Sequence, residues 1–207
     1  MAANPSKERL LAAAKDLFLA RGYAATTVEA VCEQAQLTKG GFYYSFESKE
    51  DLGLAVLDWS IRRGVQLLAS GPHARMADPA DPVDKALAFL GHLERCAPEL
   101  WSGGCLLGSF ATELADTNPR MQQAVAGLFQ AVADYFAEQL QPLAAQDAGK
   151  QAPPASELAE TLLGLIEGSI ILAKAHRDPS RLPKAIRRFR LSLATRIVEP
   201  KQAGPVE

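Results

Sequence analysis

The segment at residues 37–46, LTKGGFYYSF, combines two adjacent glycines with four aromatic residues. An α-helix turns by about 100° per residue, so Phe42 and Phe46 would share one face, with Gly40 and Tyr44 nearly opposite. We therefore expect the two phenylalanines to face the protein interior and to hold the helix in place. The opposite face is expected to be exposed.

Gly40 and Gly41 call for an explanation, because glycine inside a helix is less favourable than alanine by about 1 kcal/mol. Glycine lets another backbone come close, and the amides of a helix N-terminus attract phosphate. The hydroxyls of Tyr43 and Tyr44 are able to donate hydrogen bonds to phosphate oxygens. This combination favours DNA contact. A helical hairpin with an aromatic core would explain the phenylalanines but neither the tyrosines nor the glycines.

The residues before and after this segment predict short helices. A capping box of Thr26 and Glu29 is expected to begin a second helix, and a third is expected to begin near Thr38 after the linker 34–37. That spacing is typical of a helix-turn-helix, whose second helix enters the major groove of DNA. Ser48, followed by acidic residues, is expected to cap a fourth helix.

The remainder of the chain shows helical periodicity, without convincing β alternation or an internal repeat. The sequence thus predicts an all-α protein. An N-terminal three-helix domain is expected at 1–50, a larger helical domain at 51–199 and a flexible tail at 200–207. Turn-rich segments are expected at 71–82, 97–104 and 142–156, and further helices at 83–96, 104–116, 119–141, 157–176 and 181–198.

Composition restricts the class of protein. The net charge is −2, and residues 1–52 hold six basic and seven acidic side chains, so a DNA complex is expected to depend only weakly on salt. The three cysteines, Cys32, Cys96 and Cys105, do not suggest a disulfide framework, and they favour a reducing cytoplasm. No apolar run reaches the ~18 residues of a membrane span, and the N-terminus does not resemble a signal peptide.

Two other classes of protein fit the sequence less well than a DNA-binding protein does. An enzyme is not expected, because the chain lacks the HExxH, CxxC, GxSxG and P-loop patterns and its three histidines are scattered. No metal and no cofactor are expected either. A helical protein–protein adaptor would bind no DNA, and it would leave Tyr43 and Tyr44 unexplained.

The run TTVEAVCEQAQLTKGGFYYSFESKEDLGLAVL, at 26–57, follows RLLAAAKDLFLARGY. Over about residues 6–57 the chain resembles the TetR family of bacterial transcription regulators. The resemblance implies a homodimer, each subunit with a helix-turn-helix DNA-binding domain and a helical ligand-binding and dimerisation domain. It also implies a repressor that a small-molecule inducer releases from a palindromic double-stranded DNA operator. An activator of the same family is the alternative.

The resemblance also implies roles for single residues in DNA binding. Thr27 matches a phosphate-contacting residue at the start of the second helix, and Tyr43 matches a phosphate-binding tyrosine that Tyr44 follows. Lys49 matches a lysine at the start of the fourth helix. The opening of the recognition helix is matched by Thr38, Lys39 and Gly40.

Two positions depart from the commonest family pattern. Gly41 stands where threonine or serine is frequent, and Ser45 stands where histidine is frequent. Sequence specificity is therefore expected from Lys39, Tyr44 and the fit of the backbone, or from DNA shape.

The segment 157–176 is apolar on nearly every face, which predicts a helix buried on all sides. Gly164 and Gly168 are four residues apart, a spacing that permits two helices to approach closely. Together with 181–198, this helix resembles the dimer interface of the family. The alternative is the ordinary core of a monomer.

Cys105 falls in the expected first turn of a helix, where the thiolate form is favoured. The sequence GCLLGSFATELAD resembles TetR members that respond to reactive electrophiles, unsaturated carbonyl compounds or oxidants. In some of these a cysteine at this place is the sensor, with a lysine late in the penultimate helix, here Lys174. Two interpretations stay open: a sensing pair, or a small buried Cys105 and a Lys174 that reaches solvent.

Three other residues are candidates for the lining of a ligand cavity. Trp101 and Phe110 are aromatic, but aromatics at helical spacing are also common in a protein core. His92 is expected either to bind a ligand or to fill a polar gap between helices.

Overall fold

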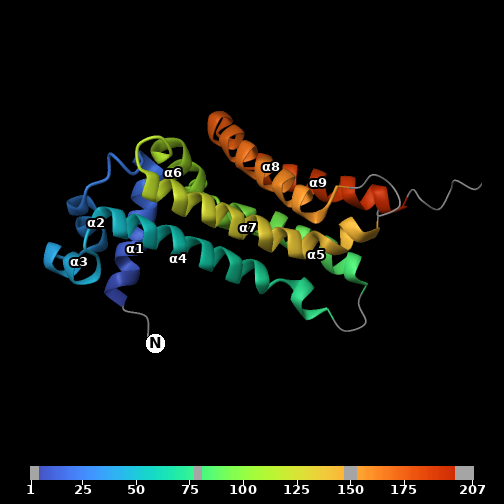
Figure 1. Ribbon diagram of the computed structural model, residues 1–207, viewed down its shortest axis with the longest axis horizontal. Coiled ribbons are helices and arrows are strands. Elements are labelled where there is room, and N and C mark those ends of the chain that lie inside the picture. Colours follow the sequence, from blue (N-terminus) through green and yellow to red (C-terminus); the bar gives the residue numbers. More distant parts are fainter. Residues whose placement is uncertain (1–4, 77–80, 147–152, 199–207) are drawn as a thin grey trace, which may run out of the picture. The chain divides into compact units, whose positions relative to one another are not determined.

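The computed structural model describes residues 5–76, 81–146 and 153–198. Within these ranges the chain forms nine α-helices, one short 3₁₀ helix and no strand, which confirms the all-α fold (Figure 1). The expected tail at 200–207 lies outside the described residues. The elements are α1 (Pro5–Arg21), α2 (Val28–Ala35), α3 (Lys39–Ser45), α4 (Lys49–Ala69), η1 (Pro72–Arg75), α5 (Pro82–Leu100), α6 (Leu106–Leu114), α7 (Pro119–Gln146), α8 (Ala155–His176) and α9 (Arg181–Val198).

The contacts divide the chain into two compact units. The first comprises Met1–Gly64 and Gly103–Gln130, and the second comprises Val65–Ser102 and Ala131–Glu207. Helices α1, α2, α3 and α6 belong wholly to the first unit, whereas α5, α8 and α9 belong to the second. The first unit therefore joins the N-terminal helices to a segment from the middle of the chain.

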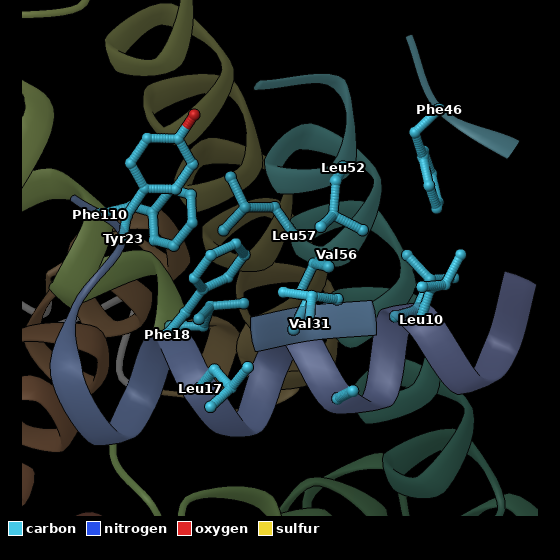
Figure 2. Packing of buried hydrophobic residues seen from close by; sticks show 14 of the residues in the cluster. Leu10, Leu17, Phe18, Tyr23, Val31, Phe46, Leu52, Val56, Leu57 and Phe110 are labelled. Carbon is cyan, nitrogen blue, oxygen red and sulfur yellow. The ribbon is translucent and has the colours of Figure 1, made fainter. Parts of the chain in front are cut away.

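The interior of the first unit is apolar, and its helical side chains come from α1, α2, α3, α4, α6 and the start of α7 (Figure 2). Phe18, Tyr23 and Phe110 form an aromatic cluster in which ring centroids lie 5.3 to 5.4 Å apart. Burying one such side chain contributes about 1.5–3 kcal/mol. Further buried side chains of this core are Leu10, Leu17, Val31, Leu52, Val56 and Leu57.

In the second unit, α9 packs against both α5 and α8. Ile186 and Phe189 are buried side chains of α9, and Phe89 of α5 meets Phe136 of α7 with ring centroids 6.0 Å apart. The side chain of Ile197, near the end of α9, lies outside the described residues. These contacts join four helices around one core.

Several helix boundaries differ from the predicted ones. Helix α5 continues through Pro98, and α7 continues through Pro142, whereas the sequence predicted ends at 96 and 141. Proline removes one backbone hydrogen bond and disfavours a helix interior, but neighbouring bonds can carry the helix through it. The 3₁₀ helix η1 forms where only turns were expected.

Helix α8 corrects one prediction, because the single chain does not bury it on all sides. Leu162 and Ile166 are buried, but Ile171 and Leu172 are 65% and 50% exposed. Apart from the nearby backbone of α8 itself, no atom of the described residues lies within 4 Å of the position that a Cβ would take at Gly164 or Gly168. The apolar pattern of this helix thus exceeds what one chain covers.

No helix of the described residues combines the length and the apolar character that a membrane span requires.

Candidate nucleic-acid interface

The turn between α2 and α3 is defined by caps on both sides. Thr27 begins α2, and its Oγ1 accepts a hydrogen bond from the Ala30 amide at 3.2 Å. Gln36 ends the helix in the left-handed conformation, with φ +52°. Thr38 then begins α3 and accepts from the Gly41 amide at 3.2 Å. Local sequence therefore fixes the angle at which α3 leaves α2.

The predicted cap of α2 was wrong by one residue. Thr26 is fully buried, and its Oγ1 donates to the Gly22 carbonyl at 2.7 Å, so it cannot cap the helix. The predicted cap of α4 is confirmed, because Ser48 Oγ accepts from the Asp51 amide at 3.0 Å and donates to its carboxylate at 2.8 Å.

The two faces of α3 differ sharply in exposure. Phe42 and Phe46 are 0% and 6% exposed, with ring centroids 5.8 Å apart, which confirms their predicted inward orientation. Tyr43 and Tyr44 are 60% and 86% exposed. The phenylalanines hold the helix against the first unit, and the tyrosines project into solvent.

Gly40 and Gly41 do not pack against another described element. Beyond the backbone of its own helix, a Cβ at either position would meet only the Thr38 hydroxyl, at 3.7 Å, among the described residues. This first turn therefore leaves space for an external partner, although the Gly41 amide is already bonded to Thr38.

Lys39 is paired inside the protein. Its Nζ lies 2.6 Å from Oε1 of Glu29 on α2, and both side chains are 60% exposed. The hydrogen bond from Lys39 lowers the pKa of Glu29, and the same bond raises the pKa of Lys39. A DNA phosphate would therefore compete with Glu29 for this ammonium.

Lys49 is held more firmly than Lys39. Its Nζ donates to the carbonyls of Tyr23, Ala24 and Thr26 at 3.2, 3.5 and 3.1 Å. The ammonium also lies 4.3 Å from the centroid of the Tyr23 ring. Through these bonds Lys49 stabilises the loop between α1 and α2.

Glu113 of α6 also binds this loop, through its backbone amides. Its carboxylate accepts from the amides of Tyr23 and Ala24 at 2.8 and 2.6 Å, where Gly22 has φ +87°. Burial, followed by the charges of Glu50 and Glu113, raises the pKa of Tyr23. Sequence reasoning missed Glu113, because 89 to 90 residues separate it from its partners.

Cys105 is the N-cap of α6 and lies one residue before the helix begins, whereas the sequence predicted it inside the first turn. Its Sγ accepts from the Gly108 amide at 3.4 Å, and the side chain is partly buried. Burial raises the pKa of both other thiols, Cys32 and Cys96. All three cysteines lie in the described part of the chain, and none is in a disulfide.

The other predicted sensing residues are divided between the two units. Phe110 belongs to the first unit with Cys105, and it is a fully buried member of the aromatic cluster. His92, Trp101 and Lys174 belong to the second unit. The proximity of Lys174 to Cys105 therefore stays a prediction.

Within the second unit these three residues are not equivalent. His92 Nε2 lies 3.0 Å from the Leu67 carbonyl, so the ring ties α5 to the end of α4. Trp101 ends α5 with its amide bonded to the Ala97 carbonyl at 3.1 Å. Lys174 is exposed near the end of α8.

Metal binding has no support in the described residues. Over 5–76, 81–146 and 153–198, no group of three or more histidine, cysteine, aspartate or glutamate side chains is arranged to hold an ion.

A capped turn between two short helices, with exposed tyrosines on the second, defines a helix-turn-helix protein of the DNA-binding class. Comparison with known families agrees with that class. The chain belongs to the TetR family of bacterial regulatory proteins, whose model matches residues 10–56, and its C-terminal part matches the LmrA/YxaF-like transcriptional regulator C-terminal domain over 82–188. It is thus a transcriptional regulator and not an enzyme.

Three relatives illustrate the match. An uncharacterised HTH-type regulator in the lacX 3′ region of Lactococcus lactis is 27% identical over 173 residues, 84% of this chain and 85% of that one. The repressor DhaR of Mycobacterium sp. (strain GP1) is 26% identical over 180 residues, 86% and 87% of the two chains. The repressor NemR of Escherichia coli is 28% identical over 127 residues, 59% and 60% of the two chains. The crystal structure of reduced NemR has the same fold, with a TM-score of 0.70 at 22% identity over 91% of this chain and 97% of that chain.

Proposed function

We propose that the chain is a homodimeric repressor that binds a palindromic operator through α3 and releases it when a small molecule reacts or binds. The observation that carries the DNA contact is the exposure of Tyr43 and Tyr44 opposite the buried Phe42. Tyr43 and Tyr44 are adjacent and are 60% and 86% exposed, so two rings and two hydroxyls are available to a DNA backbone. The names of DhaR and NemR, both repressors, support the direction of regulation.

The contacts proposed for DNA fall into three groups. The hydroxyls of Tyr43 and Tyr44 bind phosphate or base edges. Lys49 acts indirectly, because its ammonium is bonded to the α1–α2 loop. The opening of α2 and α3 supplies the remaining groups, from Thr27, Thr38, Lys39, Gly40 and Gly41.

Fluorescence anisotropy with labelled DNA flanking the protein's own gene tests this proposal. The wild type is expected to bind one fragment in that region and to shift with a dimer's stoichiometry. Replacing both Tyr43 and Tyr44 by alanine should abolish the binding, whereas Tyr135→Phe, in the second unit, should not change it. Binding that survives the double alanine variant would refute the role of this face.

The dimer is proposed to form through α8 and α9. Ile171 and Leu172 on α8 and Leu191 on α9 are the large aliphatic side chains left exposed in the single chain, among the described residues. The open space beside Gly164 and Gly168 gives a second helix room to approach. A second copy would cover both features, and it would place two α3 helices to read a palindrome.

The inducer is proposed to be an electrophile that modifies Cys105. The Cys105 thiol caps α6, where an amide hydrogen and the helix dipole favour the thiolate. The raised pKa of Cys32 and Cys96 makes these thiols poorer nucleophiles. Helix α6 also carries Glu113, so a displaced α6 would disturb the loop before α2.

N-ethylmaleimide, an unsaturated carbonyl compound, is a direct probe of this step. It should release the wild type and Cys96→Ser from DNA but leave Cys105→Ser bound. Lys174→Met tests the proposed partner, and it should slow the labelling of Cys105 measured by mass spectrometry. Release of Cys105→Ser from DNA at the wild-type rate would rule out Cys105 as the sensor. In a separate experiment, repression of a reporter gene by the protein would exclude an activator.

A further inference from the structure

The second unit contains a cavity of about 460 Å³ that α5, α9 and η1 line. Small-molecule sites have volumes of roughly 300–1,000 Å³. One part of the lining is apolar, from Pro72, Leu87 and Ala88. The other part is charged, from Glu94, Arg95 and Arg190.

The positive charges of this lining are only partly used inside the protein. Arg190 Nη2 donates to Glu94 Oε2 at 3.2 Å, but the Arg190 Nε is enclosed and has no hydrogen-bond partner among the described residues. Arg95 forms no hydrogen bond or ion pair with another described residue. An enclosed donor without an acceptor is unfavourable, so Arg190 favours a ligand that supplies one. Arg95 and Arg190 carry two positive charges and Glu94 carries one negative charge, so these three side chains have a net charge of +1.

Gly91 shows where that acceptor would lie. The position of a Cβ at Gly91 is 3.6 Å from Arg95 Nη1 and 3.9 Å from Arg190 Nε. Both nitrogens therefore border the same small space, which the absence of a side chain at residue 91 leaves open. Guanidinium groups match the planar geometry of a carboxylate.

We propose that this cavity binds a small organic monocarboxylate. The carboxylate lies over Gly91 between Arg95 and Arg190, and the apolar body of the ligand lies against Leu87 and Ala88. The single uncompensated charge favours a monoanion over a phosphate dianion. Cys105 contributes no atom to this cavity, so the site is separate from the proposed electrophile sensor.

Isothermal titration calorimetry of the full chain with octanoate tests the proposal without DNA, so its result is independent of the proposed operator binding. Octanoate is expected to bind at least tenfold more tightly than acetate, which lacks the apolar body, and than octanamide, which lacks the charge. Arg95→Gln and Arg190→Gln should each weaken octanoate binding tenfold or more. Arg188→Gln, an exposed arginine on the same helix as Arg190, is the matched control and should bind as the wild type does.

Two further variants separate binding from folding. The double variant Glu94→Gln with Arg190→Gln leaves no unpaired carboxylate, and it should fold but not bind octanoate. Gly91→Ala adds a methyl group at ordinary contact distances, so its Tm should equal or exceed that of the wild type while octanoate binding weakens. The proposal is overturned if octanoate does not bind, if octanamide binds equally well, if inorganic phosphate binds more tightly, or if the arginine variants retain the wild-type affinity.

Discussion

Helices α3 and α8 both leave large side chains in solvent, but the chemistry of those side chains differs. On α3 the exposed residues are Tyr43 and Tyr44, at 60% and 86%. On α8 they are Ile171 and Leu172, at 65% and 50%. The tyrosines carry hydroxyls that can donate to an oxygen ligand, whereas the aliphatic side chains can only be covered by another apolar surface.

The surroundings of the two helices reinforce this difference. The glycines of α3 lie in the first turn of a short helix beside the Thr38 hydroxyl and next to two exposed tyrosines, whereas those of α8 adjoin open space along an apolar helix, which suits a second helix. Two exposed faces of one chain can therefore be assigned to different partners from their polar atoms alone.

The largest effect is expected on α8. Replacing Ile171 and Leu172 by aspartate would bury two charges in the proposed dimer interface, at a cost of about 3 kcal/mol or more, roughly a hundredfold in the dimer constant. Light scattering should show a monomer, and operator affinity should fall with it. Glu160→Gln, an exposed change on the same helix, serves as the control. A variant that remains a dimer would show that this face is not the interface.

On α3 the expected effect is smaller and of another kind. Tyr44→Ala should weaken operator binding by about 1–2 kcal/mol, roughly tenfold, because it removes one hydroxyl and one ring from the contact. The dimer mass should not change. Tyr44→Phe keeps the ring and loses the hydroxyl, so anisotropy titrations of both variants separate the two contributions. If the wild type, Tyr44→Ala and Tyr44→Phe bind the operator with equal affinity, Tyr44 has no role in DNA binding.

Substitutions that loosen the loop before α2 should lower the stability of the protein more directly than its affinity for the operator. Lys49→Met and Glu113→Gln each remove charge-assisted hydrogen bonds to backbone groups, at a cost of about 1–3 kcal/mol. Urea denaturation followed by circular dichroism measures this loss. If Lys49→Met leaves stability unchanged while operator affinity falls, Lys49 contacts DNA directly and does not stabilise the loop.

The smallest effect is expected from Glu29→Gln. The change releases Lys39, so operator affinity should rise about two- to fivefold and the slope of log affinity against log salt should steepen by up to about one. Because the pKa of Glu29 is lowered, its pair with Lys39 is complete above about pH 4.3 and is lost as the pH falls through the lowered value. In the wild type the operator affinity should therefore be insensitive to this pair between pH 6 and pH 8, which anisotropy titrations can check.

Local signals predicted the helix-turn-helix and its side-chain orientation well. The alternation of phenylalanine and tyrosine around α3 gave both its faces, and Ser48 gave the start of α4. These features depend on neighbours three or four residues away, which sequence periodicity captures. The Thr26 error has the same origin, because either of two adjacent threonines fits a capping pattern and burial decides between them.

Sequence periodicity could not predict the contacts between residues that are far apart in the chain. Glu113 meets Tyr23 from about ninety residues away, and Arg190 meets Glu94 across 96 positions. No periodic pattern marks either partner. The burial of α8 was overestimated for a related reason, because a sequence shows that a helix is apolar without showing whether its own chain covers it.

The discontinuity of the first unit has a consequence for biosynthesis. Residues Met1–Gly64 leave the ribosome well before Gly103–Gln130, which supply Phe110 and Glu113. Until that later segment is made, Phe18 and Tyr23 lack the third ring of their cluster, and the loop before α2 lacks its carboxylate. A nascent chain therefore exposes an incomplete DNA-binding unit during translation and completes it only after α6 and the first part of α7, as far as Gln130, have emerged. Premature termination within α5 would yield a helix-turn-helix that lacks its support, and such a fragment would be a substrate for proteolysis.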